Sequence, residues 1–284
     1  MLIDKILVAI DFEKETNNIV SYAGYFSLKT GSSLEFLNVI DYITTPPSYL
    51  LKYIEEEKKA IEKRFIDIKN ILEKYNINLR LEIVVGRLQE SFQRYVDEKA
   101  PKMLIIGFSS HQFRRSSSEK IIKSLKVPML VVRGVSFKEI DVESVLIKKI
   151  LCPVDLSEPS KKALSFSIQL SQLLSAELLI LHVISDKFIK DKVFKEGELR
   201  EYYKVILEER RKEFYSLLES FDCKDKGEVI EGDPYIDIVR YANENNFNLI
   251  VVGARGLGLI KGLFIGSVTD SILKTSYCPV FVVH

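Results

Sequence analysis

The sequence has no tryptophan, only three cysteines and three histidines, and almost no net charge. Its 41 Lys and Arg residues offset 40 Asp and Glu residues, so the broad positive field of a non-specific nucleic-acid-binding protein is absent. No apolar run approaches the roughly 20 residues that a membrane-spanning helix needs, and the N-terminus lacks the cleavage site of a signal peptide. The cysteines and histidines show no metal-ligand spacing, and three cysteines cannot all pair within one chain. We therefore expect a reduced, cytoplasmic protein with no nucleic-acid partner, no membrane segment and no metal site built from protein ligands.

The sequence does contain an internal repeat, in which one unit occurs twice in tandem. The second copy follows the first at an offset of 144 residues near the start of the unit, 146 in its middle and 151 at its end. The first copy is therefore five residues shorter, and the loss falls between Gly107 and Pro128. We expect two domains, 1–135 and 147–284, with a mixed polar connector near Gly134–Val145. The matching segments are Lys5–Asp11 with Lys149–Asp155, Leu104–Gly107 with Ile250–Gly253, and Pro128–Val132 with Pro279–Val283.

Within each copy, short apolar runs alternate with segments of helical period. In the second copy, Ile150–Val154 is a continuous apolar run, which is typical of a buried strand. Ser157 and Pro159 then indicate the start of a helix, as the N-cap and a residue of the first turn. Strands joined by helices pair in parallel through right-handed crossovers. The sequence thus predicts an α/β fold of two tandem domains, each a five-stranded parallel sheet with helices on both faces.

The loop after the fourth strand of the second copy carries the sharpest pattern, G-x2-G-x9-G-S, formed by Gly253, Gly256, Gly266 and Ser267. Glycine lets the backbone approach a ligand closely. Gly266 and Ser267 stand where the last helix begins, and the free N–H groups of a helix N-terminus favour an anion such as phosphate. The Ser267 hydroxyl can cap this helix or donate to a phosphate oxygen. A glycine-rich turn that only joins strand to helix is the alternative reading.

Together, the repeated strand that ends in Asp, the His-Val-Ile end of the second strand and this glycine pattern resemble a tandem universal stress protein over nearly the whole chain. The resemblance implies a Rossmann-like fold (adenine nucleotide α hydrolase-like) with strand order 3-2-1-4-5, and a site for ATP or for AMP or ADP, with any Mg²⁺ held through the phosphates. It assigns the triphosphate to Gly253, Gly256, Gly266 and Ser267, with Val268 and Thr269 at the helix start and Arg255 near the phosphates. It assigns the adenosine part to Asp155 with Pro153 and Val154 beside it, and the adenine edge to the backbone of Val183.

The first copy departs from this pattern. Gly107 is kept, but Ser110 stands where the second copy has Gly256, and Arg115 stands opposite Gly266. Because the glycine-dependent cradle is lost although Asp11 remains, we expect one nucleotide per chain, bound in the second half. The first copy then serves for packing, or its run Arg114–Ser118 binds another anion or is phosphorylated.

Three functions remain open on the sequence. The leading one is an adenine-nucleotide-binding regulatory protein of the stress response with little or no hydrolysis, because no residue is placed by motif as a strong base or nucleophile and we name no catalytic residue. The others are an ATP-using enzyme and an interaction module with a vestigial site. Asp155 can instead be a loop acid that caps the next helix, and His182 is expected to be a packed or rim residue. Each copy ends in an apolar edge strand, so we expect the two halves to pair as a pseudo-dimer within the chain, with a homodimer as a further option.

Overall fold

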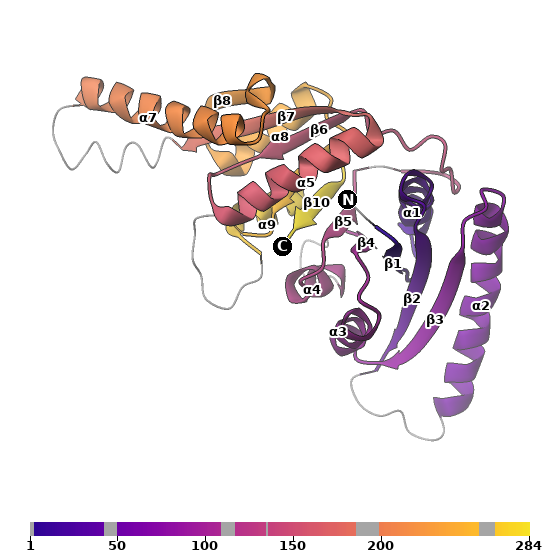
Figure 1. Cartoon of the computed structure of the whole chain (residues 1–284). Helices are drawn as coiled ribbons and strands as arrows, with labels where there is room; N and C mark the ends of the chain where they lie inside the picture. The colour runs from indigo at the N-terminus through magenta and orange to yellow at the C-terminus, as the bar shows by residue number, and fades with distance from the viewer. Residues whose placement is uncertain (1–2, 43–49, 109–116, 135, 186–198, 256–264) are drawn as a thin grey trace. The chain divides into compact units, whose positions relative to one another are not determined.

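The computed structural model describes residues 3–42, 50–108, 117–134, 136–185, 199–255 and 265–284 (Figure 1). The chain divides into two compact units, Met1–Leu146 and Ile147–His284. Within the described residues, no helix combines the length and the apolar composition that a membrane crossing requires.

The first unit is built on a parallel sheet in the order β3-β2-β1-β4-β5. Each crossover is a helix, and the reversal of strand order at β1 places α1 and α2 on one face and α3 and α4 on the other (Figure 1). The central strands β1 and β4 are apolar and buried on both faces, as parallel strands covered by helices must be. Its elements are β1 (Lys5–Ala9), α1 (Thr16–Thr30), β2 (Ser33–Asp41), α2 (Leu51–Glu73), β3 (Leu79–Gly86), α3 (Leu88–Lys99), β4 (Met103–Gly107), α4 (Ser117–Ser124) and β5 (Met129–Val132).

The second unit repeats this plan, with parallel strands in the order β8-β7-β6-β9-β10. Helices α5 and α7 contact the sheet, and α8 contacts β7 and α9. Both units therefore have the order 3-2-1-4-5, which confirms the predicted fold. The elements are β6 (Lys149–Pro153), α5 (Glu158–Leu174), β7 (Glu177–Ser185), α7 (Leu199–Ser220), the 3₁₀ turn η2 (Lys224–Lys226), β8 (Gly227–Gly232), α8 (Pro234–Glu244), β9 (Leu249–Gly253), α9 (Ser267–Thr275) and β10 (Val280–Val283).

The stretch that we expected to connect the domains packs on the first unit. The Phe137 N–H donates to Asn18 Oδ1 at 2.7 Å, and the Asp141 N–H donates to Ser21 Oγ at 2.8 Å. A Cβ on Gly24 would lie 2.6 Å from a methyl carbon of Val142, so only glycine admits this close contact. These contacts give α1 the polar partners that buried Asn18 and Ser21 need. The expected pairing of the two final strands stays a prediction.

Candidate functional site

A cleft of about 350 Å³ lies at the carboxyl ends of β6, β7 and β9 in the second unit. This is the edge where open parallel sheets bind ligands. Every residue that the sequence assigned to the nucleotide and that the structure describes lines this cleft, while Gly256 lies outside the described residues. The ten are Pro153, Val154, Asp155, Val183, Gly253, Arg255, Gly266, Ser267, Val268 and Thr269.

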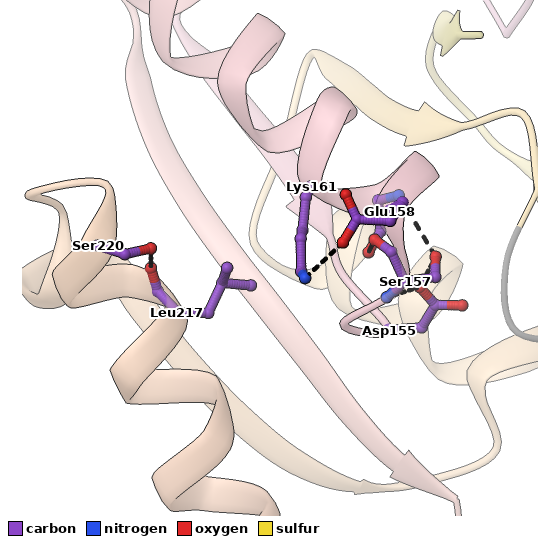
Figure 2. Close-up of polar contacts among 7 residues, drawn as sticks. Asp155, Ser157, Glu158, Lys161, Leu217 and Ser220 are labelled. Atoms are coloured by element: carbon purple, nitrogen blue, oxygen red, sulfur yellow. Dashed lines mark hydrogen bonds and ion pairs between the residues drawn. The ribbon is translucent and has the colours of Figure 1, made fainter.

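Asp155 organises the loop between β6 and α5 (Figure 2). Its Oδ1 accepts hydrogen bonds from the Ser157 N–H at 3.1 Å and from the Ser157 hydroxyl at 2.5 Å. Ser157 is the N-cap of α5, as predicted, and accepts from the Ser160 N–H. The alternative interpretation, that Asp155 itself caps this helix, is wrong, because Ser157 is the cap and Asp155 holds Ser157 in place. Asp155 also lines the cleft.

The same loop exists in the first unit. Asp11 Oδ1 accepts from the Glu13 N–H at 3.0 Å, and the residues that follow the two acids, Phe12 and Leu156, both have positive φ, 59° and 69°. Non-glycine residues seldom adopt this conformation. An acid at the end of the first strand thus has a structural role in both copies, so the residue type alone does not mark a ligand site.

Gly253 has a packing role that the sequence did not reveal. A Cβ on Gly253 would lie 2.7 Å from the carbonyl carbon and oxygen of Pro159, in the first turn of α5. A Cβ on the equivalent Gly107 would lie 2.8 Å from Ile19 Cδ1 and 3.0 Å from Glu15 Cβ, at the start of α1. The close approach of helix to strand therefore requires glycine at Gly253, where the contact is with backbone, and favours glycine at Gly107, where the contacts are with side chains.

Gly266 and Ser267 form the start of α9. Gly266 is the N-cap, and Ser267 is the first helical residue, so one of the two roles considered for the Ser267 hydroxyl, capping this helix, is wrong. The first helical bond runs from the Asp270 N–H to the Gly266 carbonyl at 2.8 Å, and the N–H groups of the first turn have no partner within a helix. Gly266 has φ −73° and ψ 158°, which any residue can adopt, so its glycine matters by the absence of a side chain and not by an unusual turn.

Thr269 is an anchor of the same helix. Its buried hydroxyl donates to the Gly253 carbonyl at 2.8 Å and so ties α9 to the end of β9. The hydrogen of its hydroxyl is therefore engaged by the protein.

Among the lining residues that sequence reasoning missed are Tyr235 of α8 and Arg210 of α7. Tyr235 Oη lies 2.9 Å from Ser267 Oγ. Both side chains enter from helices that follow other strands, so no spacing within the glycine motif could have found them. The lining includes two cationic side chains, Arg210 and Arg255, and the carboxylate of Asp155, and the Arg210 guanidinium pairs with Glu213 Oε2 at 2.8 Å.

His182 lies against the inner wall of the cleft and is 6% exposed, which confirms the expectation of a packed residue. Its Nδ1 lies 2.7 Å from the Val154 carbonyl oxygen. Because a carbonyl can only accept, Nδ1 is the protonated nitrogen. Burial holds the pKa of His182 below its ordinary value, so the ring is neutral at pH 7.

These groups sort along the cleft by chemistry. Val154, Val183 and Ile184 form apolar walls at β6 and β7, which suit a flat ring, while Arg255, the Ser267 hydroxyl and the α9 N-terminus follow the end of β9. Among the described residues, no group of three or more His, Cys, Asp or Glu side chains could hold a metal ion. The arrangement offers hydrogen-bond donors to an anion at one end and a half-buried apolar slot at the other.

The corresponding place in the first unit also has an apolar cluster. Ile184, which lines the cleft, corresponds to Ile40 in the first copy. Ile40 belongs to an apolar cluster with Ile54 on which Phe12 and Tyr42 pack. The equivalent Ile184 belongs to a similar cluster, with Ile206 and Leu207 and with Tyr203 packed against it, and it also lines the cleft. The loop residues Ser110 and Arg114–Ser116 lie outside the described residues.

A larger hollow of about 620 Å³ lies on the first unit beside α3 and the end of α4. It is an open surface lined by polar and charged side chains, including Gln89, Arg94 and Ser124. It has no enclosing apolar wall, so it is a weaker candidate for a small-molecule site than the cleft of the second unit.

Comparison with known proteins gives a consistent family assignment. The model of the universal stress protein family matches residues 3–133 and again 146–284. Universal stress protein MJ0577 of Methanocaldococcus jannaschii is 30% identical over 156 residues, which cover 49% of this chain and 96% of that protein. YxiE of Bacillus subtilis is 32% identical over 149 residues, which cover 49% of this chain and all of that protein. The crystal structure of a universal stress protein from Archaeoglobus fulgidus matches 99% of this chain and 96% of its own, with a TM-score of 0.71 at 20% identity, a likeness of fold.

Proposed function

The chain is a tandem member of the universal stress protein family, and on this premise we propose that it is an ATP-binding regulatory protein of the stress response. The nucleotide binds in the cleft of the second unit, one per chain, and is hydrolysed slowly or not at all. ADP or AMP binds the same cleft with fewer phosphate contacts.

The observation that carries this proposal is the convergence of the ten motif residues on one cleft. The three strands β7, β6 and β9 are neighbours, each ~4.8 Å from the next, so the cleft spans the ~10 Å that separate a base from its phosphates. The backbone of Val183 faces the base, Asp155 lies by the ribose, and the phosphates meet the first turn of α9. Arg255, which follows the end of β9, adds positive charge there, which favours a polyphosphate over a neutral nucleoside.

The described residues supply no evident general base for hydrolysis. Asp155 is the one carboxylate among the described residues that line the cleft, and it accepts two hydrogen bonds from Ser157. His182 is neutral, but it is bound to the Val154 carbonyl at the base end, away from the phosphates. Mg²⁺ would be held by phosphate oxygens and water, as is usual where one carboxylate or none is present.

The test combines three measurements on the full-length chain. Mass spectrometry identifies any nucleotide that the purified protein retains, calorimetric titration gives the affinity and stoichiometry for ATP, ADP and AMP, and a steady-state assay gives the rate of phosphate release. We expect one ATP per chain and turnover far below ~1 s⁻¹, the lower end of the usual enzyme range. Turnover within that range would favour an ATP-using enzyme, and no binding of any adenine nucleotide would favour an interaction module.

A further inference from the structure

His182 connects two strands and a helix behind the base end of the cleft. Besides the bond from Nδ1 to the Val154 carbonyl, its ring stacks on Phe214 of α7, with centroids 5.6 Å apart and planes at 17°. Phe214 is fully buried, so the ring has little room to turn. The Val154 N–H donates to the Leu181 carbonyl at 2.9 Å. Both backbone groups of Val154 are thus held by β7, directly before Asp155.

The first unit contains the same bond made by a different side chain. Asn38, the residue equivalent to His182, donates from Nδ2 to the Ile10 carbonyl at 2.9 Å, and the Ile10 N–H donates to the Leu37 carbonyl at 3.2 Å. Asn38 is also buried, 6% exposed. Two unlike side chains that make the same bond indicate that what matters at this position is a donor to the last carbonyl before the acid.

The aromatic contact differs between the units. In the first unit, Phe65 of α2 packs edge-on against Phe36 of β2, at 5.2 Å and 64°. In the second unit, the phenyl ring of α7 stacks on the donor residue itself. The donor side chain of the second unit, His182, is therefore held by a stacked phenyl ring as well as by its hydrogen bond.

We propose that His182 is a positioning residue of the nucleotide cleft: its Nδ1–H fixes the Val154 carbonyl, and so sets the wall formed by Val154 and Asp155 against which the nucleoside binds. This inference rests on the proposed function. The charged groups that face the ring are Arg210 and Glu213 from α7 and Asp155 from the β6–α5 loop. His182 itself does not take part in the chemistry of the ligand.

The decisive comparison uses two substitutions of one residue. His182→Asn places the donor of the first unit in the second and keeps the bond to Val154, while His182→Leu removes the donor and leaves the buried carbonyl without it. Leaving a buried polar group unsatisfied costs ~1–3 kcal/mol. By calorimetric titration, we expect the ATP affinity of His182→Asn to be within about threefold of the wild-type value. For His182→Leu, we expect the ATP affinity to fall roughly tenfold. Asn38→Leu removes the equivalent hydrogen-bond donor in the first unit and should leave ATP affinity unchanged.

A second measurement does not depend on the stability of the variants. The chain has only three histidines, so ¹⁵N spectra of the imidazoles can be assigned by single substitutions. We expect His182 to be neutral and protonated on Nδ1 at pH 7, with and without ATP. Protonation on Nε2, or equal ATP affinity in His182→Leu and the original, would overturn the inference while leaving the proposed function intact. Failure of the original chain to bind any adenine nucleotide would overturn both.

Discussion

The phenol oxygen of Tyr235 lies 2.9 Å from Ser267 Oγ, so a side chain from the start of α8 meets the first residue of α9 at the mouth of the cleft. Ser271 Oγ also donates to the Tyr235 carbonyl at 3.2 Å, which holds the two helices together. In the first copy, the equivalent residue is Gln89, whose amide donates to the Lys120 carbonyl at 3.3 Å. The contact between the two helices is therefore common to both units, but the hydroxyl beside the start of the last helix belongs to the second.

Tyr235→Phe should weaken ATP binding more than AMP binding. The phenol can donate to a phosphate oxygen at the α9 N-terminus, and a hydrogen bond to a charged group contributes ~1.5–3 kcal/mol, less where the site is exposed. Tyr235 is 41% exposed, so we expect a loss of about three- to tenfold for ATP and less than twofold for AMP, measured by calorimetry. Tyr277→Phe, at an exposed tyrosine away from the cleft, is the matched control. An equal loss for both nucleotides would argue against a phosphate contact.

Gly266→Arg should abolish ATP binding without unfolding the chain. The φ of −73° accepts any residue, but a long side chain would occupy the space where phosphate meets the first turn of α9. We expect the affinity to fall at least about a hundredfold, with an unfolding midpoint close to that of the original. Gly266→Leu, of comparable bulk without charge, separates steric exclusion from electrostatics. Wild-type affinity for ATP in both variants, or two nucleotides bound per wild-type chain, would show that the site is misassigned.

Asp155→Ala and Asp11→Ala form a matched pair. Both acids accept hydrogen bonds at the start of the following helix, so each substitution should cost about 1 kcal/mol of unfolding free energy, measured with urea. Only Asp155→Ala should weaken ATP binding, because Asp155 lines the cleft. A change of ATP affinity in Asp11→Ala would instead indicate a second nucleotide site.

The stability of the chain should depend on the protonation of His182. Burial lowers its pKa in the folded state, while in the unfolded chain the pKa is ~6.5. Above ~6.5 both states are neutral and pH has no effect through this group, whereas below it the unfolded chain takes up a proton that the folded chain does not, so the free energy of unfolding falls. His182→Asn should remove this component, visible as a smaller loss of stability between pH 7.5 and 5.5 in urea titrations. Identical pH profiles for the two proteins would contradict the assignment.

The sequence located the cleft because its motif residues follow the ends of neighbouring parallel strands. The segment Pro153–Asp155 begins at the last residue of β6, Val183 lies within β7, and Gly253 ends β9. The carboxyl ends of parallel strands meet at one edge of the sheet. The resemblance to universal stress proteins implied the strand order that both units have. What it missed were side chains that reach the cleft from helices α7 and α8, namely Arg210 and Tyr235.

At two residues, the sequence predicted the location in the cleft correctly but not the structural role of the residue. Gly253 was assigned to phosphate, yet its missing side chain is required by the backbone of Pro159, a contact between segments almost 100 residues apart. Ser267 was considered as a helix cap, yet the helix begins at Ser267 itself, one residue earlier than that role requires, and its N-cap is Gly266. Such contacts depend on how closely a helix packs on a strand, which no local spacing encodes.

The sequence by itself determined the duplication, the α/β class and the edge of the sheet at which the glycine motif lies, because these follow from periodicity and from the order of strands along the chain. Only the tertiary structure decided which side chains share the cleft and which are committed to the fold. His182 and Asn38 show the reason: they differ in type, but each lies where the second strand passes the end of the first, and each donates to the same backbone carbonyl. A hydrogen bond between strands depends on register and burial, and these are set by packing across the sheet.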